Sequence, residues 1–386
     1  MEIKPVEAIE EAMRVNATFP YTDPSREWKE KGGKVVGYNC IFIPEELIHA
    51  AGMLPFRITG DNKELGLDNA NVYLYTSTCS YIRSCFELAL GGGFDFLDGY
   101  LSASACEGVQ RLGEVWSAYL KVPMLMTLDV PRKINQRCKE FYRDDLATMK
   151  TKLEEQYGVK ITDEKLWASI KLYDETRALF HELYEMRKAE NPPIYGSEVM
   201  ELLNAAVRMP REEYNPLLRR AIQGLKVSGR QLTGKTRVMV SSSVLNNAEF
   251  LRGVERLGAL VVTDDVCTGA RYFWEPASEN MADDPLQVLA NRALGTGFPC
   301  PRTNPPVHRT ERILKMAEDW RVNGLIALTM RNCAPYVLDL PMWKSKLEEK
   351  GISVLDLDIE YGGTVTGPAR IRIEAFVEML SMQAVW

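Results

Sequence analysis

No apolar run in this 386-residue sequence reaches the roughly 18 residues that a membrane-spanning helix needs. A basic excess is also lacking: the formal net charge is −6, whereas nucleic-acid-binding proteins usually present a basic face. Residues 1–15 are charged and amphipathic, unlike a secretory signal. We therefore expect a cytoplasmic protein with neither a membrane nor a nucleic acid among its partners.

Histidine is scarce, with three in the whole chain, and the sequence contains no Cys-x-x-Cys and no His-x-x-x-His pattern. Without these pairs a zinc ribbon is not expected. The eight cysteines are not expected to form disulfides either, because the cytoplasm is reducing. For any single cysteine, the plain alternative to a ligand is a small buried hydrophobic residue.

The usual nucleotide-binding patterns are missing or misplaced. Residues Gly229–Thr236 match the spelling of a phosphate-binding loop, GxxxxGKT. That loop needs a strand before it and a helix after it, so that backbone N–H groups and the helix dipole meet the phosphates. Here a predicted helix precedes and a predicted strand follows, so we expect a polar turn with Lys235 in solvent. No G-x-G-x-x-G follows a strand, so NAD binding is not implied either.

Strand and helix patterns alternate in two parts of the chain. The alternation predicts an α/β fold with two doubly wound parallel sheets, one in residues 1–137 and one in residues 231–386. Residues 138–230 show long helical patterns without a good strand, which predicts a helical segment that joins the two α/β domains.

The stretch Phe94–Gly113 is the most informative part of the sequence. An apolar run passes through small residues to Cys106, and an amphipathic helical pattern follows. Cys106 is therefore predicted to lie where a strand ends and a helix begins. Ligands and cofactors gather at this edge of open α/β sheets, and a helix N-terminus favours a thiolate over a thiol.

Four further cysteines are expected in the same kind of position. Cys79 follows the strand-like segment Val72–Tyr75, and Cys333 follows another predicted strand, with its helix expected at 341–350. The full set is Cys40, Cys79, Cys106, Cys267 and Cys333. If both sheets point their carboxyl edges at one cleft, these thiols converge there. Several thiolates without histidine partners suit an iron–sulfur cluster.

Several segments of the sequence are similar to those of a known protein family. The chain resembles the benzoyl-CoA reductase / 2-hydroxyacyl-CoA dehydratase family of iron–sulfur subunits. The matching segments are GYNCIFIPEELIHAAGMLP, STCSYIRSCFELAL, LDGYLSASACEGVQRLG, DDVCTGARYF, LTMRNCAPYVLDLP and GPARIRIEAFVEML. The resemblance implies two flavodoxin-like domains with a cluster in the cleft between them. It places the usual three cluster thiolates on Cys79, Cys106 and Cys333.

The other cysteines leave the size of the cluster open. Cys40, Cys267 and Cys300 lie in or near matching segments, and three further thiolates would suffice for a double-cubane [8Fe-9S] cluster like that of some relatives. The alternative is a single [4Fe-4S] cluster. Cys85 and Cys138 are expected to be structural or free.

Two carboxylates and three hydroxyls are candidates for supporting roles. Glu45 and Glu46 stand at a predicted helix start beside Cys40 and could donate protons in the cleft. The plain alternative is that they only complement the helix dipole. Ser77, Thr78 and Ser104 could donate hydrogen bonds to cluster sulfides.

The resemblance implies a catalytic subunit of an ATP-dependent benzoyl-CoA reductase, similar to its smaller cluster-carrying subunit. Its implied partners are a homologous cluster-carrying subunit, an ATP-hydrolysing iron–sulfur activator, a ferredoxin upstream and an acyl-CoA substrate. The dehydratases commonly have Cys-Asp where this chain has Cys106-Glu107, which makes the runner-up, an (R)-2-hydroxyacyl-CoA dehydratase subunit, less secure. A non-catalytic electron-carrier subunit and an α/β binding protein with incidental cysteines are the remaining alternatives.

Overall fold

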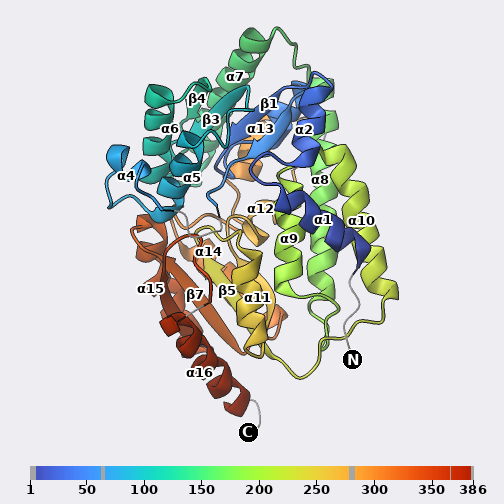
Figure 1. The fold of residues 1–386 in the computed structure, drawn as a ribbon, viewed down its shortest axis with the longest axis vertical. Coiled ribbons are helices and arrows are strands. Elements are labelled where there is room, and N and C mark those ends of the chain that lie inside the picture. Colours follow the sequence, from blue (N-terminus) through green and yellow to red (C-terminus); the bar gives the residue numbers. More distant parts are fainter. Residues whose placement is uncertain (1–5, 62–65, 278–282, 366, 384–386) are drawn as a thin grey trace.

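Two four-stranded parallel sheets form the framework of the protein (Figure 1). The computed structural model describes residues 6–61, 66–277, 283–365 and 367–383. The first sheet has the order β2-β1-β3-β4 and consists of β1 (Val35–Tyr38), β2 (Leu54–Arg57), β3 (Gly99–Ala103) and β4 (Met124–Leu128). The second has the order β6-β5-β7-β8 and consists of β5 (Thr236–Ser242), β6 (Ala259–Asp265), β7 (Gly324–Met330) and β8 (Ser353–Ile359).

The two sheets share one topology, which is consistent with two flavodoxin-like domains and confirms the predicted fold class. In each sheet the chain begins at an inner strand, moves to one edge and then crosses to the other side. Strands β1, β3, β6 and β7 are buried along their whole length, as expected for parallel sheets covered on both faces.

Helices cover both sheets and fill the space between the two domains. Those of the first part are α1 (Glu7–Ala17), α2 (Asp23–Glu30), α3 (Glu45–Ala50), α4 (Ala70–Tyr73), α5 (Ser80–Leu90) and α6 (Glu107–Tyr119). The middle of the chain forms α7 (Gln136–Tyr157), α8 (Asp163–Met186), α9 (Gly196–Ala206) and α10 (Arg211–Val227). The last part contributes α11 (Ala248–Arg256), α12 (Ala270–Phe273), α13 (Pro285–Ala293), α14 (Val307–Asp319), α15 (Ala334–Glu349) and α16 (Gly367–Gln383).

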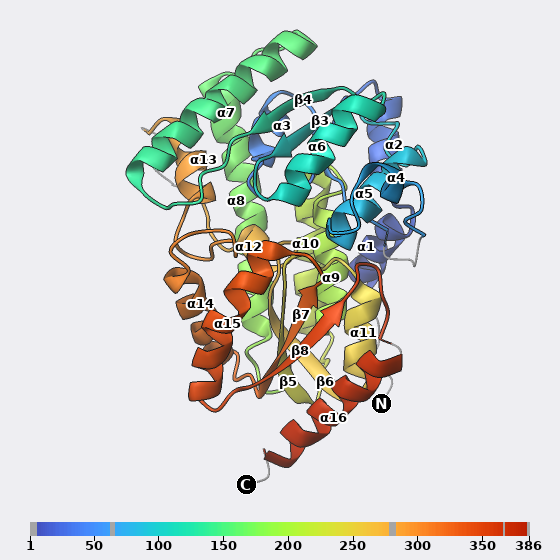
Figure 2. The ribbon, with the colours of Figure 1, turned by 90° about the vertical axis from the view of Figure 1, so that its left-hand side faces the viewer.

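The middle helices hold the two sheets together from one side. Figure 1 shows α8 running along both domains with α9 and α10 beside it, and Figure 2 shows α7 crossing the end of the molecule above β4. Helix α1 packs against α9 and α10, while α13 of the second domain packs against α7. The carboxyl ends of the two sheets approach each other, since Arg57 at the end of β2 contacts Cys267, which follows β6.

Two local predictions were wrong. The segment Val72–Tyr75, expected as a strand, lies in α4 and the loop after it, and the real neighbour of β1 is β2, which the pattern did not reveal. The side chains of Val72 and Tyr75 are 76% and 87% exposed. Residues of high β-propensity stabilise a strand mainly when they pack on a half-buried sheet surface, and these two do not. Helix α15 begins at Ala334, well before the predicted 341–350, with Pro335 in its first turn, where proline is tolerated.

The segment that matches a phosphate-binding loop has the reverse order of elements, as predicted. Gly229–Thr236 leaves α10 and enters β5. Lys235 is only half-exposed, which differs from the expected solvent position, because its Nζ donates to the carbonyl oxygen of Glu255 at 2.9 Å. In the part of the chain that the structure describes, no helix has both the length and the apolar character needed to cross a membrane.

Candidate functional site

Three of the predicted ligands share one structural position and one cavity. Cys79, Cys106 and Cys333, called the first trio below, are the N-cap residues of α5, α6 and α15. All three line a cavity of about 470 Å³ between the two domains. Three helix N-termini, each carrying a partial positive charge, therefore meet where three thiols lie.

Local sequence explains how these helices come so close. At Gly108 an added Cβ would lie 3.0 Å from Cγ1 of Ile82 and 3.8 Å from Sγ of Cys79, so the absence of a side chain lets α6 approach α5. Asn332 precedes Cys333 with φ of 65°, a left-handed conformation that asparagine tolerates better than most residues. Its side-chain amide donates to the carbonyl oxygen of Thr76 at 3.2 Å and so joins the Cys333 loop to the Cys79 loop.

The thiols of the first trio influence one another. Burial raises the pKa of Cys79, and the neighbouring Cys333 and Cys106 raise it further, whereas a hydrogen bond from the Ile82 N–H lowers it. Burial likewise raises the pKa of Cys106 to about 11, although the Val109 N–H opposes the shift. With their pKa values raised in this way, Cys79 and Cys106 are neutral thiols at pH 7. A bound metal would be needed to hold them as thiolates.

The remaining three candidate ligands also meet. Cys40 follows β1, Cys267 follows β6 and Cys300 lies in the loop after α13; they are called the second trio below. Burial raises the pKa of Cys40, and Cys267 and Cys300 both add to the increase. Burial also raises the pKa of Cys300, while a hydrogen bond from the Arg302 N–H opposes the shift. Thiols from both domains are thus close enough to repel one another once ionised.

Buried arginines surround the second trio. Arg57, at the end of β2, donates to Sγ of Cys267 at 2.6 Å and to the carbonyl oxygen of Cys267 at 3.0 Å. Within the described ranges, Nε of Arg57 and Nε of Arg302 have no hydrogen-bond partner, although both side chains are more than nine-tenths buried. Unpaired buried guanidinium N–H groups are costly unless an anion lies beside them. The unpaired N–H groups of Arg57 and Arg302 are the kind of donor that an anionic metal–sulfide group would need beside it.

The two trios are neighbours. The ionisation of Cys106 in the first trio is opposed by Cys300 of the second as well as by Cys333. Arg302 in turn is close enough to Cys300, Cys40 and Cys106 to interact electrostatically with all of them. Pairwise electrostatic interactions therefore link the six thiols at the boundary between the domains.

The six thiols have the donor chemistry that iron–sulfur clusters use. Among the described residues, no group of three or more histidine, cysteine, aspartate or glutamate side chains is placed to hold one metal ion. The thiolates of a four-iron cluster each bind a different iron, so they lie further apart than the ligands of one ion. A donor set of thiols alone, flanked by helix N-termini and guanidinium groups, suits the anionic charge of such a cluster.

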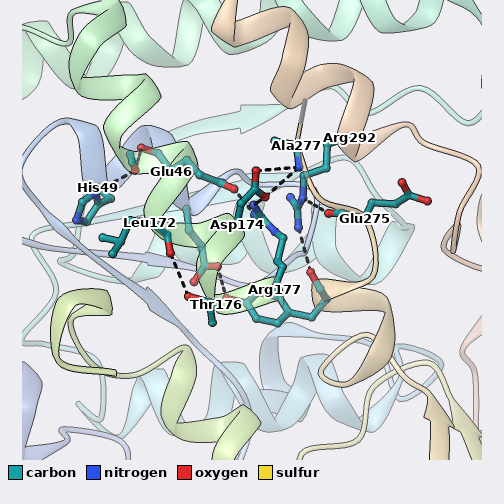
Figure 3. Close-up of polar contacts among 12 residues, drawn as sticks. Glu46, His49, Leu172, Asp174, Thr176, Arg177, Glu275, Ala277 and Arg292 are labelled. Atoms are coloured by element: carbon teal, nitrogen blue, oxygen red, sulfur yellow. Dashed lines mark hydrogen bonds and ion pairs between the residues drawn. The ribbon is translucent and has the colours of Figure 1, made fainter. Parts of the chain in front are cut away.

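The two candidate proton donors lie in buried ionic networks outside the cavity of the first trio. Glu46 pairs with Arg177, which also binds Asp174, and Figure 3 shows the guanidinium group between the two carboxylates. Burial works against ionisation of Glu46, but Arg177 and Arg292 outweigh it and lower its pKa to about 2. A carboxylate with such a low pKa is a poor proton donor at neutral pH.

Glu45 has a different set of partners. It accepts hydrogen bonds from the hydroxyl of Tyr38 at 2.6 Å and from Arg211 at 3.2 Å, and also from the hydroxyl of Tyr272. These partners come from the first sheet, α10 and α12, so Glu45 joins three parts of the fold. A role in proton transfer stays a prediction for both carboxylates.

The candidate hydroxyls divide into two groups. Ser77 and Thr78 line the cavity of the first trio, within reach of a bound group. Ser104 does not line it, and its Oγ accepts a hydrogen bond from the Val130 N–H at 3.0 Å. Its role toward a cluster stays a prediction. Cys85 is fully buried on α5, and Cys138 lies in the first turn of α7.

Sequence reasoning missed the arginines. Arg57 and Arg302 stand in no motif, and a lone arginine in a sequence usually indicates a solvated side chain. The only available signal was position: Arg302 lies two residues after Cys300, and Arg57 ends a strand at the same sheet edge as Cys40.

Comparisons with known proteins place the chain among subunits of acyl-CoA dehydratases and reductases. Residues 40–380 match the family described as 2-hydroxyglutaryl-CoA dehydratase, D-component. The chain is 26% identical to a benzoyl-CoA reductase subunit of Thauera aromatica over 365 residues, which cover 93% of this chain and 94% of the relative. It is equally similar, at 26%, to the (R)-phenyllactyl-CoA dehydratase beta subunit of Clostridium sporogenes, over 92% of this chain and 94% of the relative. The (R)-2-hydroxyglutaryl-CoA dehydratase beta subunit of Acidaminococcus fermentans is 26% identical over 96% of this chain and 98% of its own length.

Proposed function

This chain belongs to the 2-hydroxyglutaryl-CoA dehydratase D-component family, and from that premise we propose that it is the iron–sulfur subunit of an enzyme that reduces an acyl-CoA thioester. The first candidate reaction is the dearomatising reduction of benzoyl-CoA. The relatives include subunits of a reductase and of dehydratases, so family membership alone does not choose between them. The observation that supports the reductase is the closeness of the two thiol trios.

The number of electrons separates the two reactions. Dehydration of a 2-hydroxyacyl-CoA consumes no electrons overall, and one recycled electron suffices. Reduction of an aromatic ring to a diene takes up two electrons and two protons. Six thiols around one region could hold two joined four-iron units, a [8Fe-9S] cluster, which would supply one-electron steps at low potential and store both electrons.

The residues of this chain would perform three tasks in that reaction. Six cysteines would bind iron as thiolates, with the helix N-termini of α5, α6 and α15 stabilising the negative charge of the first trio. The hydroxyls of Ser77 and Thr78 would donate hydrogen bonds into the cavity. The buried side chains of Cys40, Arg57 and Arg302 would exclude water from the second trio, which limits unproductive oxidation.

The partners proposed for this chain follow from the same chemistry. Each relative is named as one subunit of its enzyme or complex, so we propose a homologous cluster-carrying subunit beside this chain. Electrons of very low potential require an energy source, and we propose an ATP-hydrolysing iron–sulfur activator supplied by a ferredoxin. The thioester would bind at this chain or at its partner subunit.

Iron and sulfide analysis of protein purified without oxygen tests the cluster directly. The proposal expects about eight irons per chain, in a brown protein that is sensitive to oxygen. About four irons would leave the first trio as the only cluster site and would favour the single-cluster dehydratase. Negligible iron would contradict the proposed function and favour a binding protein with incidental cysteines.

A paired substrate assay tests the reaction. The chain, its partner subunit and the activator are supplied with reductant and ATP, and then with either benzoyl-CoA or an (R)-2-hydroxyacyl-CoA. Ring reduction with two electrons consumed per product is the expected result. Elimination of water without net electron consumption would identify a dehydratase subunit, and no turnover with either thioester in the presence of a full cluster would identify an electron carrier.

A further inference from the structure

The environments of the two trios differ in charge. Around the second trio, Arg57 contacts Cys267 directly, Arg302 lies close to Cys40 and Cys300, and Arg271 lies close to Cys300. The side chains of Arg57, Arg302 and Arg271 are 0%, 8% and 6% exposed. Arg302 is also close to Cys106 of the first trio, but the other arginines near that trio are less buried: Arg83 acts on Cys79 from a half-buried position, and the side chain of Arg111 is 53% exposed.

The buried arginines are only partly neutralised. Arg271 forms an ion pair with Asp265, which Arg309 shares. In the described part of the chain, neither Arg57 nor Arg302 has an ion pair with a carboxylate; their guanidinium groups donate instead to backbone carbonyl oxygens and, for Arg57, to a thiol. Two buried positive charges therefore remain beside the second trio.

Such charges act on electron transfer. Each electron added to a metal centre adds one negative charge, and a nearby buried cation stabilises that charge more strongly than an exposed cation does, because water screens the latter. Hydrogen bonds from guanidinium N–H groups to thiolate sulfur act in the same direction. Of the two trios, the second thus favours the reduced state.

We propose that the buried charges of Arg57 and Arg302 favour an added electron beside the second trio, whereas electrons enter beside the first trio, which lines a cavity between the domains. This inference deepens the proposed function and rests on it. A reduced iron–sulfur activator would give up one electron at a time, and Arg57 and Arg302 would stabilise the added negative charge beside Cys40, Cys267 and Cys300. Two such one-electron reductions would supply the electron pair that the acyl-CoA thioester takes up together with two protons.

Replacing the buried arginines by methionine tests this proposal. Arg302→Met and Arg57→Met remove the charge and keep much of the side-chain volume, and the midpoint potential of the first reduction is measured by dye-mediated titration followed by electron paramagnetic resonance. We expect the equilibrium constant for that step to fall by a factor of ten or more, which is about 59 mV for one electron. Arg302→Lys should restore most of the loss because it returns the charge.

The control is Arg111→Met, which removes an exposed arginine that lines the first cavity and should leave the potential unchanged. Arg57→Met also breaks two contacts to Cys267 and could lose iron for that reason. In that case the potential of Arg302→Met decides the test. An unchanged potential in arginine variants that keep about eight irons would overturn this inference and leave the proposed function intact. About four irons in the wild-type protein would instead show that the six-thiol site of the proposed function had failed, and this inference with it.

Discussion

The two thiol trios face the same region but are built by different means. The first uses backbone: each cysteine caps a helix, and helix N-termini supply the positive potential. The second uses side chains: its cysteines stand in loops, and buried guanidinium groups supply the charge. Helix termini can stay partly open to solvent, and the first trio lines a cavity between the domains, whereas the arginines beside the second trio are buried.

The meeting edges of the two sheets thus offer two electrostatic settings to chemically identical ligands. A partial charge at a helix end is fixed in the fold and acts over the first turn only, whereas a guanidinium group carries a full charge and reaches further in a low-dielectric interior. The chain could thus set two potentials with the same kind of thiolate.

Replacing Cys106 should have the largest effect of the variants considered. Cys106 interacts with Cys333 in its own trio and with Cys300 in the other, so its removal affects both. We expect Cys106→Ala to lose most of its iron and to lower activity by more than about 100-fold, since even partners of metal ligands cost 10- to 100-fold. Cys138→Ala, outside both trios, is the matched control and should keep its iron.

Cys300→Ala shows whether the trios act independently. Independent trios would leave about half the iron in this variant, whereas complete loss would mean that the two form one indivisible centre. Iron quantitation on protein purified without oxygen decides between these outcomes. Iron retained in Cys106→Ala would remove Cys106 from the ligand set.

The buried pair of Glu46 and Arg177 should stabilise the side of the molecule that holds the second trio. Glu46 follows Cys40 closely in sequence, and its pKa is lowered from 4.5 to about 2 by Arg177 and Arg292, against the effect of burial. Because the folded-state pKa lies below the unfolded one, the stabilisation is present above about pH 4.5 and is lost as the pH falls toward 2. The shift corresponds to roughly 3 kcal/mol.

Glu46→Gln should therefore lower the free energy of unfolding by about 3 kcal/mol at pH 7. The difference from the wild type should shrink below pH 4.5 and disappear near pH 2, which denaturant titrations at several pH values would measure. The control is Glu182→Gln, which breaks an exposed pair with Lys226 and should cost less than about 1 kcal/mol. Equal losses in the two variants would show that the buried pair adds no stability beyond that of an exposed one.

The features that could be predicted from the sequence are those that depend on local residue patterns. Buried apolar runs between helical patterns gave the two parallel sheets, and cysteines just beyond strands gave most of the thiols at their carboxyl edges. The helix cap at Cys333 was not predicted because Pro335 and Pro341 obscured the helical pattern. Arg57 was missed for a deeper reason: its contact with Cys267 joins residues 210 positions apart, and no local pattern contains that information.

The smallest expected effect concerns the loop that holds Cys333. Asn332 adopts φ of 65° and joins its loop to Thr76, so Asn332→Ala removes one hydrogen bond and places a side chain that disfavours the left-handed region. We expect a cost of about 2 kcal/mol, with roughly half from each cause. Iron bound by the first trio should also be released faster to a chelator, while that of the second trio should not.

Asn332→Gly separates the two causes, since glycine adopts this φ freely but cannot bond to Thr76. It should recover the part of the stability that comes from backbone strain and still release iron faster than the wild type. Equal chelation rates for both trios in Asn332→Ala would contradict separate support of the two sites, because this contact joins the loops of Cys333 and Cys79, which both belong to the first trio. Such a result would mean that a change in the Cys333 loop affects iron binding by all six thiols together.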